Sequence, residues 1–367
     1  MNIILINKRY FPWIGGVESH VKQIANGLVH YGIKPRVICC HTTPNTEHQQ
    51  VDGISVLRYG SRKTLFSLPI SLPFLLKFIP KPWQSPRPIL HFHLPNPLAV
   101  LAYFIHRPHG LVVVTWHSDI IKQRILLWAY RPLLRWFLKR ADAIIATSPP
   151  MAKLSPFLIP HQKKTTVIPL GIPPRPPAGL TKLPSERYAL FVGRLVYYKG
   201  VETLIEALKQ SPATVYIVGE GPQLDAIQKK GHALIHHQQL RIYNQQSESK
   251  LHDLFDHCEF LILPSTHASE AFGLVQLEAM MRRKAVISTQ LPTGVPYVNQ
   301  HNQTGLVVPP GDSVALAKAM TQLWKNPQQC QQFGARAHQR YMDHFTEEQM
   351  LTKTYHLFNN LHAASPI

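Results

Sequence analysis

Residues 188–200 read YALFVGRLVYYKG, and this stretch contains the unit from which the whole chain is built. A short apolar run is followed by Gly193, by the cations Arg194 and Lys199, and then by a helical pattern. An apolar run of this length that ends in a glycine turn before a helix is typical of a buried parallel strand. The stretch therefore predicts one strand-turn-helix unit of an α/β domain.

The same alternation of apolar runs and helical stretches recurs along the chain. Six runs in the first half have the composition of buried strands: NIILIN (2–7), KPRVICC (34–40), ILHFHL (89–94), LVVVTWH (111–117), AIIATS (143–148) and TTVIPLG (165–171). Six more follow in the second half: YALFVGR (188–194), ATVYIVGEG (213–221), LRIYNQ (240–245), FLILPS (260–265), KAVIST (284–289) and TGLVVPP (304–310). This pattern predicts two doubly wound α/β domains with parallel sheets.

The length and a proline-rich segment place the domain boundaries. A chain of 367 residues exceeds a typical single domain. The segment IPPRPPAGLTKLPSER (172–187) has no strand or helix period and suits a stiff linker. We therefore assign a first domain to 1–172, a linker to 173–187 and a second domain to 188–345. Helices are expected over 313–326, 327–344 and 346–362. The last segment, 346–367, is a candidate for packing against the first domain.

The charge of the chain is concentrated in its first half. The formal net charge is +19, and residues 1–170 hold 21 Lys and Arg against 5 Asp and Glu, a balance of +16. This asymmetry predicts an anionic partner for the first domain: nucleic acid, a membrane surface or a phosphorylated acceptor. The four cysteines form no CxxC motif and no metal spacing, and no secretory signal follows Met1. We therefore expect a cytoplasmic protein.

Two basic stretches without acidic residues favour a membrane surface. Residues 121–140, IKQRILLWAYRPLLRWFLKR, predict a helix with an apolar stripe and a cationic flank, as in helices that lie among lipid headgroups. A core-facing amphipathic helix is the alternative for this stretch. Residues 62–83, RKTLFSLPISLPFLLKFIPKPW, contain four prolines and predict an irregular flap. Neither stretch has 18 uninterrupted apolar residues, so no membrane span is expected.

A pair of glutamates in SEAFGLVQLEAM (269–280) is the strongest candidate for a ligand site. If residues 275–281 are helical, Glu270 and Glu278 stack on one helix face, with Glu270 at the helix start. A helix start favours phosphate, and the two carboxylates then suit a ligand with hydroxyls at both ends. The alternative is a surface helix with two solvated carboxylates.

Further candidate residues follow other predicted strands. Gly15 and Gly16 lie at a helix start in KRYFPWIGGVESHV (8–21), and His117 and Asp119 lie at a strand end in TWHSD (115–119). His91 and His93 have a spacing that suits metal ligands, but no third ligand is apparent. Arg194 and Lys199 predict an anion clamp for a diphosphate leaving group. The missing G-x-G-x-x-G motif disfavours a dinucleotide dehydrogenase.

The order and spacing of these motifs resemble glycosyltransferase family 4, whose members have the GT-B fold, retain anomeric configuration and use nucleotide-sugar donors without a metal. The matching segments are GGVE (15–18), HSD (117–119), GRLVYYKG (193–200), GEGP (219–222), EAFGLVQLE (270–278) and GLVVPPGD (305–312). HLPNPLA (93–99) and TWHSDIIKQ (115–123) are similar to bacterial enzymes that build O-antigen or capsule on a lipid carrier. Several of these are mannosyltransferases, so GDP-mannose is the favoured donor.

The resemblance implies a GT-B architecture of two Rossmann-like domains whose parallel sheets face a cleft. It assigns catalytic roles to four residues: Glu270 to hydroxyls of the transferred sugar, His117 to the reacting carbon, and Arg194 and Lys199 to the leaving diphosphate. Donor binding falls to Gly15, Gly16, Gly193, Glu220, Phe272, Gly273, Leu274 and Glu278, with Glu278 on the ribose. Acceptor contacts fall to Asp119, His93 and Asn96. No metal ligand and no cofactor is expected, and retention would follow front-face attack with the departing phosphate as base.

The favoured hypothesis is a hexosyltransferase, peripheral on the cytoplasmic face of the bacterial inner membrane, with a lipid-linked saccharide acceptor in O-antigen synthesis. The alternatives are a transferase for UDP-glucose, UDP-galactose or UDP-N-acetylglucosamine, a soluble sugar-phosphate synthase or GT-B epimerase, and a basic nucleic-acid-binding protein. No nucleic-acid-binding module is recognisable, so no nucleic acid is expected as partner. Two segments depart from the family pattern, RIYNQQ (241–246) near the base site and MMRRKAV (280–286) at a turn. The first leaves the nucleobase open.

Overall fold

A computed structural model describes residues 1–13, 15–65, 68–80, 83, 87–120, 124–175 and 186–364. The chain divides into two compact units. The N-terminal unit comprises Met1–Leu170 and Glu348–Ile367, and the C-terminal unit comprises Gly171–Glu347. Residues 176–185 of the expected linker lie outside the described residues. Each unit is considered by itself below.

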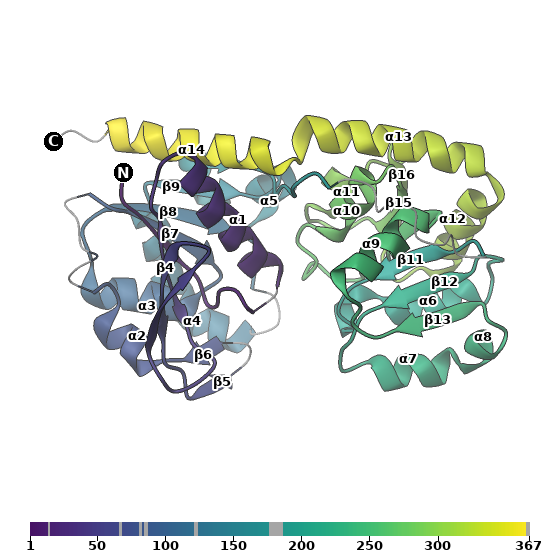
Figure 1. Ribbon diagram of the computed structural model, residues 1–367, viewed down its shortest axis with the longest axis horizontal. Coiled ribbons are helices and arrows are strands. Elements are labelled where there is room, and N and C mark those ends of the chain that lie inside the picture. Colours follow the sequence, from purple (N-terminus) through teal and green to yellow (C-terminus); the bar gives the residue numbers. More distant parts are fainter. Residues whose placement is uncertain are drawn as a thin grey trace. The chain divides into compact units, whose positions relative to one another are not determined.

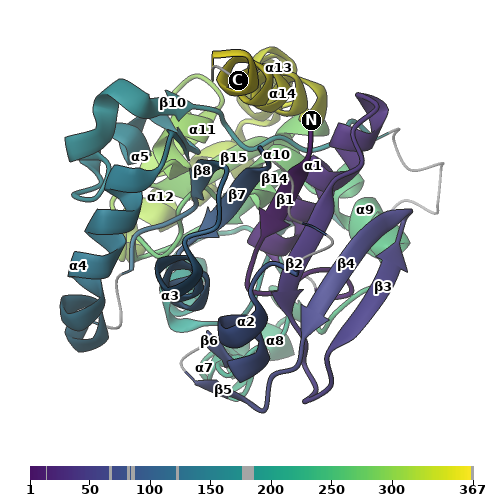
Figure 2. The same cartoon turned by 90° about the vertical axis from the view of Figure 1, so that its left-hand side faces the viewer.

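The N-terminal unit contains an eight-stranded sheet in the order β10-β9-β8-β7-β1-β2-β4-β3 (Figures 1 and 2). All neighbouring strands are parallel except the edge pair β3–β4. The strands are β1 Ile3–Ile6, β2 Arg36–Cys40, β3 Glu47–Val51, β4 Ile54–Tyr59, β7 Ile89–Leu94, β8 Leu111–Trp116, β9 Ala143–Ala146 and β10 Thr165–Val167, with a separate hairpin of β5 Lys63–Leu65 and β6 Leu68–Ile70.

Helices cover both faces of this sheet because side chains of successive strand residues point to opposite faces. On one face Leu5 and Val113 pack with α1 and with Phe358 of α14. On the other face Phe92 contacts Tyr103 of α3 and Phe137 of α4. The helices of this unit are α1 Gly16–His30, α2 Leu72–Lys77, α3 Pro97–His106, α4 Arg124–Arg140, α5 Pro149–Leu154, the 3-10 helix η2 Ile159–Lys164 and α14 Glu347–Ala364, whose first residue belongs to the other unit.

The C-terminal unit contains a six-stranded parallel sheet in the order β13-β12-β11-β14-β15-β16 (Figure 1). This order is that of a doubly wound dinucleotide-binding sheet, and it reverses between β11 and β14. The strands are β11 Ala189–Val192, β12 Val215–Val218, β13 Leu240–Tyr243, β14 Phe260–Leu263, β15 Ala285–Thr289 and β16 Gly305–Val308. Ligands bind at such a reversal because the helices on either side leave the carboxyl ends of the two strands open.

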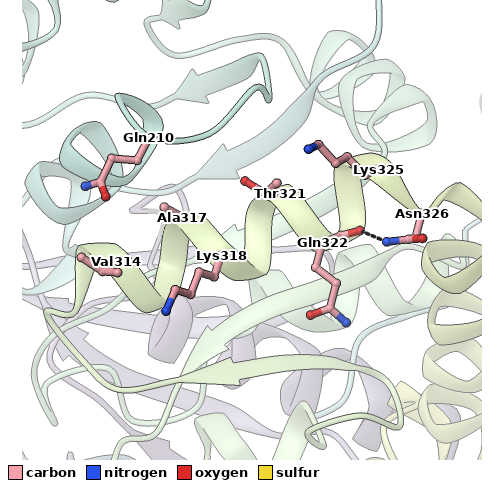
Figure 3. A pocket seen from close by; sticks show the side chains of 8 residues that line it. All are labelled: Gln210, Val314, Ala317, Lys318, Thr321, Gln322, Lys325 and Asn326. Carbon is pink, nitrogen blue, oxygen red and sulfur yellow. Dashed lines mark hydrogen bonds between the residues drawn. The ribbon is translucent and has the colours of Figure 1, made fainter.

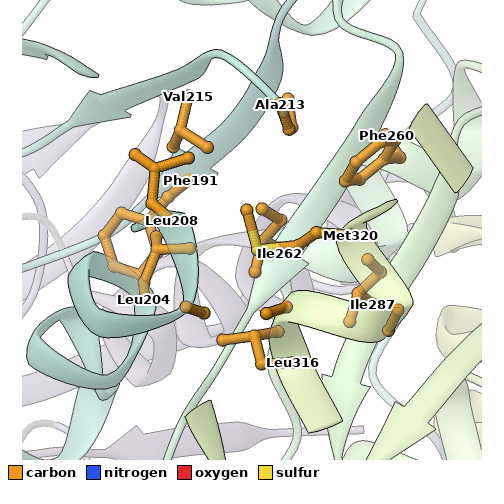
Figure 4. Close-up of a cluster of buried hydrophobic side chains, with 14 of the residues drawn as sticks. Phe191, Leu204, Leu208, Ala213, Val215, Phe260, Ile262, Ile287, Leu316 and Met320 are labelled. Carbon is orange, nitrogen blue, oxygen red and sulfur yellow. The ribbon is translucent and has the colours of Figure 1, made fainter. Parts of the chain in front are cut away.

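The core of the C-terminal unit forms between one face of the sheet and the helices α6 and α12. Figure 4 shows Phe191 and Ile262 of the sheet with Leu204 of α6 and Met320 of α12. All four side chains are buried. The helices of this unit are η3 Tyr197–Lys199, α6 Val201–Leu208, α7 Leu224–Lys230, α8 His232–His236, α9 Glu248–His257, α10 Val275–Met281, α11 Val295–Val298, α12 Ser313–Lys325 and α13 Pro327–His344.

The twelve predicted strands are confirmed, as are the helices at 313–326, 327–344 and 346–362 to within two residues. The prediction of an irregular flap over 62–83 is wrong. The described part of this segment forms β5, β6 and α2. Pro73 lies in the first turn of α2, where a proline costs no helical hydrogen bond. Phe74 and Phe78 are fully buried and anchor the segment.

The predicted lipid-facing stripe of residues 121–140 is also corrected. Leu134, Phe137 and Leu138 of α4 are fully buried and face the sheet, so the core-facing alternative holds for this part of the helix. Trp128, by contrast, is 81% exposed. Residues 121–123 lie outside the described residues. None of the described helices combines the length and apolar character needed to cross a membrane.

Candidate glycosyl-transfer site

The predicted donor residues of the C-terminal unit gather where β11 and β14 end. Gly193 and Arg194 directly follow β11, and Ser265 and Glu270 follow β14. These two strands flank the point where the strand order reverses. Parallel strands bring their carboxyl ends to one edge, so two segments seventy residues apart in sequence meet there.

A buried ion pair joins these two segments. Lys199 Nζ lies 2.6 Å from Glu270 Oε2, and the two side chains are 12% and 10% exposed. Ser265 Oγ donates a hydrogen bond of 3.1 Å to the same carboxylate oxygen. Burial alone would lower the pKa of Lys199, but the charge and hydrogen bond of Glu270 raise it above its usual value. Lys199 is therefore a fixed cation at the switch point.

Two glycines allow these loops to approach each other. Gly200 has φ +69°, and a Cβ atom there would lie 2.0 Å from the carbonyl oxygen of Pro264. Gly273 has φ +74°, and its Cβ would lie 2.6 Å from Leu263 Cδ2. Both positions exclude a side chain by backbone conformation and by space. The sequence therefore fixes how closely the Lys199 loop packs on β14.

The predicted helix over 275–281 is confirmed as α10, but Glu270 and Glu278 do not stack on one face of it. The helix begins at Val275 with Leu274 as its N-cap, so Glu270 lies in the preceding loop. Its carboxylate is held by Lys199 and Ser265 rather than by the geometry of the helix. Across the described residues, the backbone amides of 272–274 donate no hydrogen bond to another residue, as expected for amides that hold a ligand.

Glu278 lies on α10 and is partly buried. Burial raises the pKa of its carboxyl group, and the positive charges of Arg282 and Arg175 oppose that rise. Arg282, one of the two arginines that depart from the family pattern, forms a 2.9 Å ion pair with Asp256 of α9. Arg283 has φ +59° and ends the helix in the left-handed conformation. The Arg282-Arg283 pair therefore changes how α10 ends, and Glu278 still lies within the regular part of the helix.

The remaining donor residues of this unit are more exposed. Arg194 is exposed beside Gly193 at the end of β11. Glu220 follows β12, and its carboxylate accepts a 3.2 Å hydrogen bond from the backbone amide of Gln245. In the segment RIYNQQ, Arg241 pairs with Glu186 outside the predicted donor cluster.

In the N-terminal unit, Gly15 is the N-cap of α1 and Gly16 is its first residue. A Cβ atom at Gly15 would lie 2.3 Å from Glu18 Oε2, so the glycine makes room for this carboxylate. Burial raises the pKa of Glu18 and lowers that of Lys8, and each charge partly offsets the shift of the other. The helix start predicted for ligand approach is therefore present and well formed.

His117 follows β8 and joins a buried group of histidines. Its Nε2 lies 3.0 Å from His93 Nδ1 of β7, and its ring packs edge-on against His20 of α1. His91, two residues before His93 on the same face, forms a 2.7 Å hydrogen bond with Thr115. The sequence pattern revealed no third histidine for His91 and His93, whereas the fold brings His20 and His117 to the same place as His93.

Comparison with known proteins identifies this arrangement. A model described as Glycosyltransferase Family 4 matches residues 14–175, and one described as Glycosyl transferases group 1 matches residues 178–340. The chain is 31% identical to the O-antigen chain mannosyltransferase C of Escherichia coli, over 98% of this chain and 99% of that protein. The chain belongs to glycosyltransferase family 4. It is 34% identical to the D-rhamnosyltransferase WbpZ of Pseudomonas aeruginosa, over 94% and 92% of the two chains.

Solved structures give the fold of this glycosyltransferase. A sucrose-phosphate synthase of Thermosynechococcus elongatus has a TM-score of 0.80 at 23% identity, over 99% of this chain and 100% of that one. The Anabaena Alr3699/HepE protein in complex with UDP has a TM-score of 0.77 at 19% identity, over 98% and 100%. The predicted GT-B fold is confirmed, and so is the prediction that the chain is a hexosyl-transferring enzyme.

Two residues predicted on the acceptor side of the glycosyltransferase have structural partners. Asp119 Oδ1 accepts hydrogen bonds of 2.9 Å from Trp116 Nε1 and 2.7 Å from Ser155 Oγ. Asn96 caps α3 through a 3.3 Å bond from the amide of Ala99, while its Nδ2 is buried without a partner. Asp119 therefore shapes the loop after His117, and Asn96 keeps a donor for another group. Their contacts with an acceptor stay predictions.

Sequence reasoning missed two residues of these clusters. Ser265 was read only as the end of a strand, and its hydrogen bond to Glu270 depends on the path of the loop. The helical pattern of residues 16–30 contained the information needed to place His20, because His20 lies on the same buried face of α1 as Val21 and Ile24. A histidine in such a stripe points toward the sheet.

A groove on the C-terminal unit is lined by none of the predicted site residues. It runs along α12, and Figure 3 shows Lys318, Thr321 and Gln322 of that helix with Gln210 beside it. Val314 and Ala317 line the groove together with polar side chains that include Lys318 and Lys325. The buried Lys199–Glu270 pair is not part of this lining.

Proposed function

We propose that this enzyme transfers mannose from GDP-mannose to a lipid-linked saccharide during O-antigen synthesis, with retention of configuration. The observation that carries the donor site is the buried Lys199–Glu270 pair at the strand-order reversal of the C-terminal unit. The choice of mannose is supported by the full-length similarity to the O-antigen mannosyltransferase. D-rhamnose is the second candidate, supported by the similarity to the D-rhamnosyltransferase. This sugar is 6-deoxymannose and differs from mannose only at C6.

The proposed chemistry needs positive charge at the leaving group. When the bond between the sugar and the diphosphate breaks, negative charge develops on the phosphate oxygens. Lys199 is held as a cation by Glu270, and Arg194 is exposed six residues from Gly200 in the same loop. We assign to these two side chains the neutralisation of the leaving diphosphate.

The remaining donor contacts follow from position and chemistry. Glu270 would accept hydrogen bonds from hydroxyls of the transferred sugar, and Ser265 holds its carboxylate for that contact. The unpartnered amides of 272–274 would bind phosphate or sugar oxygens. Glu278 on α10 would bind the ribose, and Gly16 and His117 of the N-terminal unit would contact the phosphates and the sugar. The acceptor hydroxyl would attack on the face that the diphosphate leaves, with the phosphate as base.

Donor identity is tested by nucleotide-sugar protection against thermal unfolding. GDP-mannose is expected to raise Tm more than UDP-glucose, UDP-galactose and UDP-N-acetylglucosamine at the same concentration. GDP-D-rhamnose separates the two candidates, because a site built for mannose would bind the C6 hydroxyl and lose affinity without it. Protection by UDP-sugars alone would overturn the guanine assignment. Retention is checked by the anomeric configuration of the product in an NMR assay with lipid-linked acceptor.

We further propose that the N-terminal unit holds the enzyme on an anionic membrane surface, on the cytoplasmic side. In this unit α3 contacts α2, β6 and α4, and these four elements carry seven exposed apolar side chains, which we call the apolar face. The members of this apolar face are Ile70, Leu72, Leu76, Leu101, Phe104, Ile105 and Trp128. Leu72 and Leu76 are 62% and 65% exposed on the short helix α2 (Figure 2).

Exposed cations accompany this apolar face. They lie on α2 and α4 or directly after α3: Lys77, Arg131, Arg135, Lys139 and Arg107. Large exposed apolar side chains with Lys and Arg around them bind at the headgroup level, where the rings and aliphatic chains enter the lipid and the cations meet phosphate. This arrangement suits an enzyme whose acceptor is anchored in the same membrane.

A further inference from the structure

Three histidines from three different elements converge in the N-terminal unit. His20 comes from α1, His93 from β7 and His117 from the loop after β8. One ring nitrogen of each lies within 4.8 Å of those of the other two. Within the described ranges, this is the group of His, Cys, Asp or Glu side chains with the spacing of a metal site. All three side chains are buried.

The distance between two of the ring nitrogens is close to that between ligands in a coordination sphere, and the distances to His20 are at most 4.8 Å. Zinc binds imidazole nitrogen at about 2.0–2.1 Å in tetrahedral geometry, which places two ligand nitrogens about 3.4 Å apart. His93 Nδ1 and His117 Nε2 are 3.0 Å apart. An ion that replaced their hydrogen bond would have to separate these two atoms by only a few tenths of an ångström.

Each of the three imidazoles is neutral and so has one ring nitrogen with a lone pair for a metal ion. The His93–His117 hydrogen bond uses one N–H group, so metal binding requires the other tautomer of that ring. Burial lowers the pKa of His20 to about 4 and holds the pKa values of His93 and His117 well below their usual range. Neutral imidazole is the form that binds metals. His20 Nδ1 and His93 Nε2 are also buried without a hydrogen-bond partner. An unpaired buried polar atom costs folding free energy, and His20 Nδ1 would gain a partner if it bound the ion.

The opposing group is Lys8, whose charge adds to the lowering of the His117 pKa. Its repulsion would act on any bound cation. Burial also lowers the pKa of Lys8, so its charge is the more easily lost. A hard ion such as Mg²⁺ prefers oxygen ligands, so its bonds to imidazole would not offset the repulsion by Lys8. An ion that bonds strongly to imidazole, such as Zn²⁺, would offset it.

We propose that His20, His93 and His117 form a binding site for a borderline transition-metal ion such as Zn²⁺. The site shares His117 with the proposed sugar-transfer site, whereas the residues assigned to the diphosphate, Arg194 and Lys199, are not among its ligands. Its consequence rests on the proposed function: His117 is the residue assigned to the donor sugar, so an ion bound there takes His117 away from the substrate. Bound Zn²⁺ is therefore expected to inhibit transfer.

The test is a titration of the full-length, metal-free protein with Co²⁺, the spectroscopic substitute for Zn²⁺. The expected result is one tight site with the strong visible absorption of four-coordinate Co²⁺, which Zn²⁺ then displaces. His20→Gln and His93→Gln, made separately, should each weaken binding on the order of 100-fold, because each removes one of three ligands. Mg²⁺ should compete with neither ion.

The matched control is His109→Gln, because His109 is exposed and is not one of the three histidines of the cluster. It should bind Co²⁺ like the wild type. Unchanged Co²⁺ binding by both cluster variants, or only the weak absorption of six-coordinate Co²⁺, would overturn the site. Far-UV circular dichroism of each variant without metal shows that it is folded, and a variant that is not folded leaves the other to decide.

Inhibition is measured separately from binding. If Zn²⁺ binds at the cluster and transfer falls with the same concentration dependence, both the site and the role of His117 stand. If Zn²⁺ binds at the cluster but transfer is unchanged, the metal site stands and the assignment of His117 to the donor sugar is wrong. If transfer falls equally in the wild type and in His20→Gln, the inhibition arises elsewhere and the proposed consequence is refuted.

Discussion

Lys199 Nζ and Glu270 Oε2 form a 2.6 Å ion pair between loops that follow β11 and β14. Both side chains are buried, and each neutralises the charge of the other. Ser265 Oγ donates a further hydrogen bond to Glu270. A donor diphosphate would compete with Glu270 for Lys199, and sugar hydroxyls would compete with Lys199 for Glu270. Before the donor binds, each residue of the pair therefore occupies the position that a group of the donor would take, which keeps both side chains oriented for binding.

Loss of the carboxylate should affect both stability and turnover. In Glu270→Gln, Lys199 remains buried without its counter-charge, which costs up to about 3–5 kcal/mol when a buried pair is broken. We expect a lower midpoint in urea and a decrease in kcat on the order of 10²–10³. Glu206→Gln is the control, because Glu206 forms an exposed pair with Lys209 in the same unit. Transfer at the wild-type rate by folded Glu270→Gln would refute its role.

Loss of the cation should weaken the hold on the diphosphate. Lys199→Met is expected to reduce the affinity for the free nucleoside diphosphate by about tenfold to a hundredfold, since a charge-assisted hydrogen bond contributes about 1.5–3 kcal/mol. Calorimetric titration with GDP measures this effect. Lys209→Met removes an exposed lysine of the same unit and should bind GDP normally. Equal losses in the two variants would mean that Lys199 acts only through general charge.

The close approach of two loops at Gly200 should be intolerant of a single methyl group. Gly200→Ala places a Cβ 2.0 Å from the Pro264 carbonyl oxygen in a backbone conformation with φ +69°. Gly311→Ala is the matched control, with φ +79° and no atom within 4 Å of the added Cβ. The control should lose about 1 kcal/mol of unfolding free energy from strain alone. Gly200→Ala should lose clearly more, and its Lys199 should no longer bind GDP at full strength.

Replacement of Glu278 by glutamine should raise the stability of the protein and weaken its binding of nucleotide. The pKa of its carboxyl group is raised in the folded state, so stability falls as the pH rises from the ordinary carboxyl pKa, and the loss is complete above the raised pKa. Glu278→Gln should therefore be more stable than the wild type at neutral pH. The difference should vanish as the pH falls below the ordinary carboxyl range, where both side chains are neutral. Chemical denaturation across this pH range measures it.

The same substitution should weaken nucleotide binding if Glu278 holds the ribose. The loss of a charged acceptor is expected to reduce affinity for GDP by about tenfold, or about 1.4 kcal/mol. Glu206→Gln is again the control, because Glu206 forms its exposed ion pair with Lys209 and is not among the charges that act on Glu278. A Glu278→Gln variant that gains stability and binds GDP unchanged would remove the ribose role while leaving the electrostatic account intact.

Membrane attachment should depend on the apolar face and on salt. In Leu72→Ser/Leu76→Ser, two exposed leucines of α2 lose their apolar surface, and partition onto anionic vesicles should fall at least tenfold. Ile159→Ser removes an isoleucine that is 53% exposed elsewhere in the N-terminal unit and should bind vesicles normally. Cosedimentation at low and at high salt separates the apolar from the electrostatic share. Wild-type protein that ignores anionic vesicles at low salt would overturn the proposal.

Local patterns predicted most of the secondary structure. Buried parallel strands read as continuous apolar runs because both faces of the sheet are covered, and all twelve such runs became strands. The edge strand β3, with the polar sequence EHQQV, escaped detection because only part of it is buried. In α4, the stripe of Leu134, Phe137 and Leu138 had the spacing of an amphipathic helix, but spacing alone does not tell a protein core from a lipid layer as the apolar partner.

The sequence by itself determined the strand-helix order, the glycine turns and the residue types available for phosphate and sugar binding, because these depend on neighbours along the chain. Only the tertiary structure decided which distant residues meet. Glu270 was expected to depend on a helix face shared with Glu278, and instead its partners are Lys199 and Ser265. His20 joined His93 and His117 for the same reason. Parallel strands bring their carboxyl ends to one edge, so contacts there are set by strand order and not by separation in sequence.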